Sequence, residues 1–200
     1  LALREMQAFL AGLPYVEGGT DGIRVDLDAA GEKVISAIST WTGGDISVDL
    51  PVTRTGPELS SEKLSRVCDV LGTATTDYSF SSASRAVNVE NGCRLISGAV
   101  LMPGESFSVT AAVTPFSAEN GYEQAPSYEE NRVVDSYGGG ICQGSTTLYN
   151  AVLLAELEVI ERFPHSMVID YVPFSMDAAL AYPYKDLKFR NNTDAPIYIE

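Results

Sequence analysis

Three consecutive glycines, Gly138–Gly140, stand directly before a helical pattern, and this junction restricts the fold more than any other feature of the chain. Glycine adopts backbone angles that are closed to other residues and lets neighbouring groups approach the chain closely. The pattern after the glycines predicts a helix over 145–157 whose buried face carries Leu148, Ala151, Val152 and Ala155. Cys142 lies between the two. The sequence therefore predicts a loop that delivers a thiol to a helix N-terminus.

The remaining chain mixes strand and helix patterns. Residues 23–27 and 46–52 alternate as strands around a helix that Asp28 caps and whose apolar face holds Ala30, Val34, Ala37 or Ile38, and Trp41. Strand patterns return at 158–163, 166–174, 186–191 and 195–200, with a turn at 191–196. We expect an α+β fold with a mixed, mostly antiparallel sheet and several packed helices, preceded by a small β-α-β unit. The expected domains are 1–56, a connecting helix over 57–72, and 73–200.

Charge and composition exclude several function classes. The net charge of −14 argues against nucleic-acid binding, which needs a basic surface. No apolar run approaches the ~20 residues of a membrane span. The chain begins without Met and stops inside a strand pattern, so we expect a fragment that lacks its targeting segment. With one histidine and no Cys-x-x-Cys spacing, we expect no metal site and no cofactor.

The three cysteines differ in their surroundings. Cys68 and Cys93 fall on the apolar faces of predicted helices, the first with Leu64 and Leu71, so we expect both to be structural. Cys142 instead lies at a helix start, where unpaired N–H groups and the helix dipole stabilise a thiolate. The N–H groups of Gly138, Gly139, Gly140 and Cys142 are suited to an oxyanion hole. We predict that Cys142 is a nucleophile for acyl transfer.

The only histidine, His165, is the natural general base for this thiol. Asp177 and Asp186 are both candidates to orient its imidazole, and the sequence does not choose between them. Arg162, three residues before the histidine, is a candidate to hold a ligand carboxylate. Arg85 and Asn88 lie off the apolar stripe of their predicted helix and are candidate polar anchors.

At these residues the chain resembles the VanW family, named from its link with vancomycin-resistance clusters in Gram-positive bacteria. The likeness rests on "GGGICQGSTTLYNA" with the later histidine, on "SRAVNVENGCRLISGAVLMPGESFSV" and on "ENGYEQAP", and covers about residues 73–200. Residues 15–60 resemble the end of a peptidoglycan-binding domain that often precedes VanW. Two positions depart from the family pattern. Gly144 replaces a larger residue, which predicts a looser loop, and "FSMDAAL" replaces a Gly-x-Asp-Ala-Thr-Val pattern.

This resemblance implies an L,D-transpeptidase that forms 3→3 peptidoglycan crosslinks with a cysteine nucleophile and releases D-Ala. Its partners would be peptidoglycan stem peptides, and its location the outside of a Gram-positive cell, anchored through an upstream segment. The implied catalytic residues are Cys142, His165 and Asp177. The implied oxyanion loop comprises Gly138, Gly139, Gly140 and Gln143. The implied substrate-binding residues are Arg162, Arg85, Asn88, Ser145 and Thr146. The acidic residues Glu123, Glu129, Glu130 and Asp135 are candidates to attract a cationic acceptor.

Three alternatives remain open on the sequence. A thiol endopeptidase, amidase or carboxypeptidase would use the same residues with water as the acceptor. A non-catalytic wall-binding module would hold a stem peptide in the glycine loop and pack Cys142 as an apolar residue. A redox or scaffold role ranks last, because no second cysteine is placed to resolve Cys142.

Overall fold

The computed structural model describes residues 19–57, 59–129 and 132–200, and the chain falls into two compact units. One unit comprises the chain up to Arg66, and the other comprises Val67–Glu200. Among the described residues of the predicted connection, the only helix is α3 (Ser61–Leu64), which is capped by Ser60. The predicted helical face through Cys68 was therefore wrong, and Cys68 is exposed. All the predicted site residues belong to the second unit.

The first unit is an antiparallel strand pair with a helix in its connection. β1 (Gly22–Val25) pairs with β2 (Val52–Thr55), with Gly22 opposite Thr55. α2 (Leu27–Ser39) follows β1, and the Asp26 side chain caps it by accepting a hydrogen bond from the Ala29 N–H. The cap is thus two residues earlier than predicted. The predicted strand at 46–52 was wrong except at its last residue.

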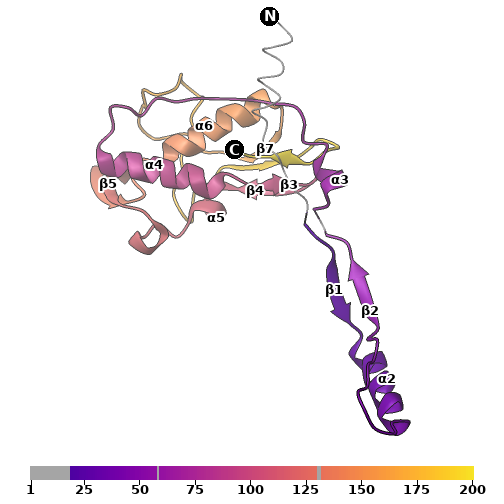
Figure 1. Ribbon diagram of the computed structural model, residues 1–200. Helices are drawn as coiled ribbons and strands as arrows, with labels where there is room; N and C mark the ends of the chain where they lie inside the picture. The colour runs from indigo at the N-terminus through magenta and orange to yellow at the C-terminus, as the bar shows by residue number, and fades with distance from the viewer. Residues whose placement is uncertain (1–18, 58, 130–131) are drawn as a thin grey trace, which may run out of the picture. The chain divides into compact units, whose positions relative to one another are not determined.

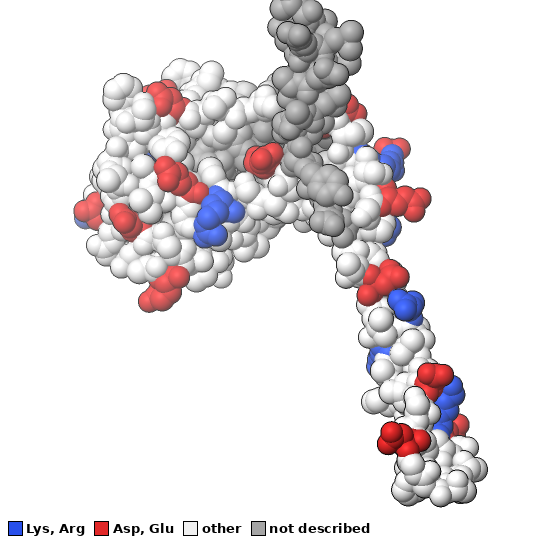
Figure 2. All heavy atoms as spheres, viewed as in Figure 1, with Lys and Arg blue, Asp and Glu red and all other residues white. Residues whose placement is uncertain are grey.

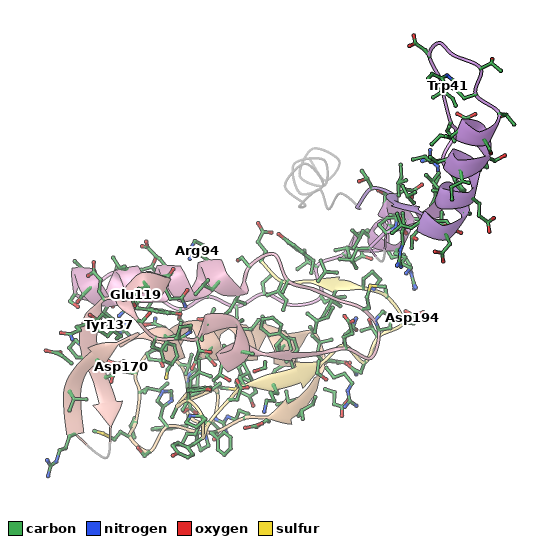
Figure 3. All side chains as sticks on the ribbon, turned by 90° about the horizontal axis from the view of Figure 1, so that it is seen from below. Trp41, Arg94, Glu119, Tyr137, Asp170 and Asp194 are labelled. Atoms are coloured by element: carbon green, nitrogen blue, oxygen red, sulfur yellow. The ribbon has the colours of Figure 1, made fainter. Side chains whose placement is uncertain are left out.

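The predicted apolar face of α2 was also wrong as a buried face. Ala30 is buried, but Ile38 is 61% exposed and Trp41 56% exposed. Trp41 lies beyond the C-terminal end of the helix, where its indole N–H donates to the Gly44 carbonyl at 2.9 Å (Figure 3). Within this unit, the described strands and helix contribute little core.

The second unit is an α+β fold of helices packed on short antiparallel sheets, and this confirms the predicted fold class (Figure 1). Its helices are α4 (Ala83–Ile96), α5 (Val109–Val113), the 3₁₀ turn η1 (Ala118–Asn120) and α6 (Ile141–Leu154). Its strands are β3 (Val100–Leu101), β4 (Ser106–Ser108), β5 (Gln124–Glu129), β6 (Arg132–Tyr137), β7 (Glu158–Glu161), β8 (Lys188–Arg190) and β9 (Ile197–Tyr198). The sheets are β3-β9, β4-β8-β7 and the β5-β6 hairpin.

The core of this unit lies between the β4-β8-β7 sheet and the helices. Phe189 of β8 is fully buried, and its ring packs on Phe107 of β4 with the centroids 5.6 Å apart. Val109 and Val113 of α5 and Val152 of α6 complete the same cluster. Burial of side chains of this size contributes about 1.5–3 kcal/mol each. This cluster fixes α6, which carries Cys142 at its first turn.

Helices α4 and α6 approach each other closely through glycine. A Cβ at Gly92 of α4 would clash with Ile141 of α6, and a Cβ at Gly144 would lie 3.3 Å from the Cys93 sulfur. Gly144 is buried inside α6, so its lack of a side chain shapes the helix contact and does not loosen a loop. Cys93 is exposed on α4, and its prediction as a core residue was wrong.

Two predicted boundaries near the site also differ from the structure. α6 begins at Ile141, four residues earlier than predicted, because Gly140 serves as its N-cap with a φ of 107°, an angle that favours glycine. The predicted strand at 166–174 was wrong, since this segment has no regular secondary structure. It forms part of the wall of the cavity described below.

Asn88 of α4 joins the glycine loop to the β5-β6 hairpin. Its side chain is fully buried, donates to the carbonyls of Glu123 and Gly139 at 2.9 Å each, and accepts from the Glu123 N–H at 2.8 Å. Gly139 is needed there, because a Cβ would overlap the Ala125 carbonyl. The amide of Asn88 thus replaces a sheet partner for this piece of backbone.

Replacement Asn88→Ala should lower the free energy of unfolding by about 1–3 kcal/mol, because it leaves buried backbone groups without partners. Chemical denaturation followed by circular dichroism measures the change. Glu90→Ala on the exposed face of α4 is the matched control and should change the free energy by less than about 0.5 kcal/mol. Equal effects of the two substitutions would contradict the bracing role of Asn88.

Candidate functional site

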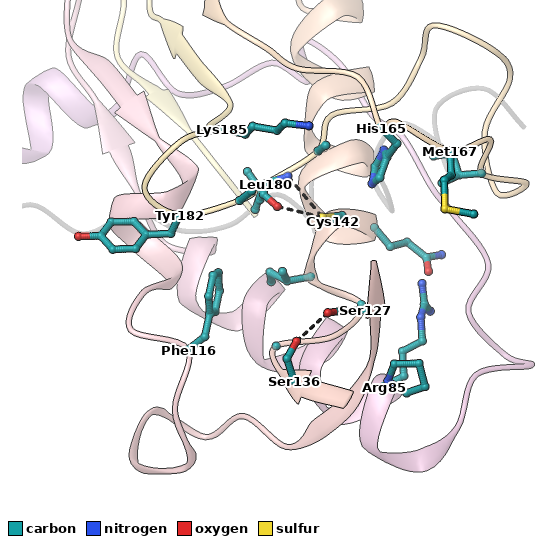
Figure 4. A pocket seen from close by; sticks show the side chains of 18 of the residues that line it. Arg85, Phe116, Ser127, Ser136, Cys142, His165, Met167, Leu180, Tyr182 and Lys185 are labelled. Carbon is teal, nitrogen blue, oxygen red and sulfur yellow. Dashed lines mark hydrogen bonds between the residues drawn. The ribbon is translucent and has the colours of Figure 1, made fainter. Parts of the chain in front are cut away.

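A cavity of about 570 Å³ lies at the N-terminus of α6 (Figure 4). This volume is within the range of pockets that bind small ligands. Its wall is formed by α4, the β5-β6 hairpin, the glycine loop and two segments near 165–171 and 179–185. The lining residues are Arg85, Phe116, Pro126, Ser127, Ser136, Tyr137, Gly138, Gly140, Ile141, Cys142, Gln143, His165, Ser166, Met167, Ile169, Tyr171, Ala179, Leu180, Ala181, Tyr182 and Lys185. Cys142 and His165 therefore share one cavity.

The glycine loop leaves two N–H groups at the thiol. The N–H of Gly138 donates to the Glu123 carbonyl, that of Gly139 to Ser136, and that of Ile141 to Gly138. In the described chain, no backbone carbonyl accepts from the N–H of Gly140 or of Cys142. These two groups lie at the N-terminus of α6, where the helix dipole also favours negative charge. The N–H of Gln143 donates to the Gly140 carbonyl, so Gly140 and Cys142 carry the N–H groups that remain open for the predicted oxyanion site.

The Cys142 thiol is half-buried and contacts the backbone of Leu180. It accepts from the Leu180 N–H at 3.3 Å and donates to the Leu180 carbonyl at 3.6 Å. Burial raises the pKa of this thiol, while the Leu180 N–H and the charges of Lys185 and Arg85 oppose the rise. Because burial is the larger effect, the group is a neutral thiol at neutral pH. A base is needed to make it a nucleophile.

One face of α6 binds the segment that follows. Cys142, Thr146 and Asn150 are spaced four residues apart and therefore lie on one side of the helix. They bond Leu180, Ala178 and Met176 in turn, with the Ala178 N–H donating to Thr146 Oγ1 at 3.0 Å and Asn150 Nδ2 donating to the Met176 carbonyl at 2.7 Å. Segment 176–180 is thereby fixed along α6.

The opposite edge of this segment carries the histidine. The Ala179 N–H donates to the Phe163 carbonyl at 2.8 Å. Asp177 Oδ2 lies 2.7 Å from His165 Nδ1 and accepts from the His165 backbone N–H at 2.6 Å. In the described chain, no group bonds the other ring nitrogen, Nε2. His165 lines the cavity with this nitrogen available for proton transfer.

Arg162 binds Asp177 through both its side chain and its backbone carbonyl. Its guanidinium donates to Asp177 Oδ1 at 2.7 Å, to the Asp177 carbonyl at 2.6 Å and to the Ser175 carbonyl at 3.0 Å, and it stacks over the Tyr149 ring. Burial would raise the pKa of Asp177, but the hydrogen bonds from His165 and the Arg162 charge outweigh it and hold the pKa below its ordinary value. The orienting group is therefore a carboxylate at neutral pH.

Of the two aspartates that the sequence offered as partners of the imidazole, Asp177 is the one that bonds His165. Asp186 instead accepts from the Ser108 hydroxyl and from the Thr110 N–H at 2.9 Å, at the start of α5. Asp186 thus secures the junction of β4 and α5.

The predicted substrate-binding residues fall into two groups. Arg85 lines the cavity, and its guanidinium donates to the Ser81 hydroxyl at 2.6 Å. Arg162, Asn88, Ser145 and Thr146 do not line it, and the last three are buried. Ser145 Oγ has no partner among the described residues. Gln143 touches the cavity but is 2% exposed, because its amide donates to Thr76 Oγ1 and to the Asp77 carbonyl.

Lys185 and Leu180 are site residues that the sequence reasoning missed. Lys185 lies in a tight turn in which Ala181 and Lys185 exchange backbone hydrogen bonds. The Tyr-Pro-Tyr stretch before it signals a turn, yet no spacing relates that turn to Cys142. Leu180 acts through its backbone, which leaves no signal in its side chain.

Other predicted features fall away from the cavity. Glu123 and Asp135 are exposed and do not line it, while Glu130 and the Glu129 side chain lie outside the described part of the chain. Figure 2 shows acidic groups scattered singly over the visible face of the second unit, without a basic patch. Among the described residues there is no cluster of metal-ligating side chains, and no helix has the length and hydropathy of a membrane span.

Sequence comparisons place these residues among known proteins. A family described as "VanW like protein" matches residues 84–200. An uncharacterised protein of Bacillus subtilis (strain 168), YoaR, is 32% identical over 157 residues, which cover 78% of this chain and 52% of that protein. The "Vancomycin B-type resistance protein VanW" of Enterococcus faecalis (strain ATCC 700802 / V583) is 27% identical over 121 residues, covering 58% and 44%. The chain spans about half the length of these curated relatives. No solved structure matches it at a significant level.

The raised pKa of Cys142 should be visible in alkylation by iodoacetamide. In a Cys68→Ser, Cys93→Ser variant, the rate should rise with pH and have its inflection above that of a cysteine in a short peptide, because burial disfavours the thiolate. Mass spectrometry of quenched samples gives the rate, and the peptide is the control. An inflection at or below pH 7 would instead show a preformed thiolate–imidazolium pair.

Proposed function

This chain belongs to the VanW family, and on that premise we propose that it is a cell-wall L,D-transpeptidase with Cys142 as its nucleophile. The observation that carries the proposal is the shared cavity of Cys142 and His165, with His165 oriented by the Asp177 carboxylate. Nucleophile, base and orienting group form the constellation of thiol acyl-transfer enzymes. The name of the enterococcal relative links that protein to vancomycin resistance, which supports a cell-wall role for this chain.

In the first half-reaction, the donor is a tetrapeptide stem bound with the carbonyl of its third residue at Cys142. His165 Nε2 takes the thiol proton as the sulfur attacks this carbonyl carbon. The resulting oxyanion accepts hydrogen bonds from the N–H groups of Gly140 and Cys142, which no described carbonyl occupies. The carbon–nitrogen bond to D-Ala then breaks, His165 returns the proton to the departing amine, and a thioester remains on Cys142.

In the second half-reaction, the side-chain amine of a neighbouring stem attacks the thioester. The amine loses a proton to His165, the carbon–sulfur bond breaks, and the released thiolate recovers that proton from the imidazolium. A 3→3 crosslink forms and Cys142 is restored. Asp177 stays ionised throughout and stabilises the imidazolium, which is consistent with the low pKa of its carboxyl group. Because both stems belong to the wall, the enzyme acts outside the cytoplasmic membrane.

Mass spectrometry of the purified chain mixed with disaccharide-tetrapeptides tests the reaction. A crosslinked dimer that is lighter than two monomers by one D-Ala should form and be absent with Cys142→Ala and Cys142→Ser. His165→Ala should lower the rate on the order of 10²-fold or more if it is the base. Tripeptide without dimer would replace the transpeptidase by a carboxypeptidase. Binding without any product would favour a wall-binding module.

Asp177→Asn and Asp186→Asn form a matched pair for the orienting role. Asp177→Asn keeps the shape but removes the charge beside His165 Nδ1, so kcat should fall on the order of 10²- to 10⁴-fold. Asp186→Asn should lower stability, since it disturbs the bonds to Ser108 and Thr110, while the folded protein keeps its kcat. Crosslinking rates corrected for the folded fraction measure both, and the reverse order would remove Asp177 from the mechanism.

A further inference from the structure

The cavity around Cys142 carries positive charge in a chain whose net charge is −14. Arg85 and Lys185 both line it, and its described lining residues include no aspartate or glutamate. The charges of both residues also oppose the rise in the pKa of the Cys142 thiol that burial causes. A cavity with this lining is suited to an anionic ligand.

Three other basic residues of the second unit have acidic partners. Arg162 pairs with Asp177, Lys188 with Glu161 and Arg190 with Glu158. No carboxylate of the described residues lies within ion-pair distance of Arg85 or Lys185. A half-buried cation without an acidic partner is available to an anionic ligand.

Arg85 and Lys185 come from different elements and lie in different parts of the cavity wall. Arg85 rises from α4 and is held by Ser81, and its stem lies under the glycine loop, where a Cβ at Gly140 would approach its Cγ within 2.7 Å. Lys185 is presented by the turn that Ala181 closes. In Figure 4, Lys185 and His165 lie on one side of Cys142 and Arg85 on the other.

We propose that Lys185 binds the free carboxylate of the residue that leaves, so that the acyl donor must end one residue beyond the bond that is broken. This inference rests on the proposed function and assigns the residue that selects its donor. His165 protonates the leaving amine, so the leaving amino acid lies on the His165 side of Cys142. In an α-amino acid a single carbon joins the amine to the carboxylate, so the carboxylate lies on the same side of Cys142. Lys185 occupies this side. An internal peptide bond offers no carboxylate there and is a poor donor.

Binding to the Cys142→Ala variant tests this without requiring turnover. Isothermal titration calorimetry compares a tetrapeptide stem ending in D-Ala with the same stem ending in D-Ala carboxamide. The acid should bind about 10- to 100-fold more tightly, as expected for a hydrogen bond to a charged group. Adding Lys185→Met should remove this preference, and adding Lys185→Arg should restore part of it. Lys188→Met, which alters a neighbouring lysine outside the cavity, should leave the preference unchanged.

Each outcome decides the inference. Equal binding of acid and carboxamide overturns it, as does a preference that survives Lys185→Met, and so does the absence of binding by either stem at millimolar concentration. A preference for the acid that depends on Lys185 supports it, whatever the wild-type chain does with the stem. If that preference is found but the wild-type chain forms no crosslink, the transpeptidase proposal fails while the carboxylate site stands.

Discussion

Segment 176–180 is the element on which the candidate site depends. Its alternate residues bond in opposite directions, with Met176, Ala178 and Leu180 bound to α6, and Asp177 and Ala179 bound to residues 163–165. The segment has no sheet ladder of its own, so side chains of α6 satisfy much of its buried backbone. The same hydrogen bonds that fix it also set Asp177 against His165, which lines the same cavity as Cys142. Stability and chemistry thus share one set of contacts.

The electrostatics of the Cys142 thiol explain why the proposed acyl transfer requires a base. A helix N-terminus stabilises a negative charge by about 0.3–1 kcal/mol, which is less than the ~1.4 kcal/mol that corresponds to one pKa unit. Burial of Cys142 works in the opposite direction and prevails, even with Lys185 and Arg85 nearby. In the proposed reaction, the N-terminus of α6 therefore contributes its N–H groups to an oxyanion more than it activates the resting sulfur.

Several polar side chains that attract attention in the sequence are occupied in the fold. Asn88 and Thr146 bond backbone groups of neighbouring segments, and Arg162 holds the carboxylate beside His165. Nothing in their spacing distinguishes a ligand contact from such a brace, because both need a buried polar group near the site. Lys185 is the opposite case, a residue without any motif that a turn brings to the cavity. Helix faces were misjudged at Trp41 and Cys93, where an apolar stripe predicts burial but the described fold leaves it exposed.

The sequence by itself determined the α+β class and the glycine-to-helix junction at Cys142, because periodicity and turn chemistry act over a few neighbouring residues. The family followed from the resemblance of its motifs. The sequence also singled out His165, the only histidine of the chain. Only the tertiary structure decided that Asp177 and not Asp186 bonds this histidine. It also decided that the N–H groups of Gly138 and Gly139 bond backbone carbonyls, while no described carbonyl accepts from those of Gly140 and Cys142. These choices depend on contacts between segments separated by tens of residues, where packing rather than local preference sets the distance.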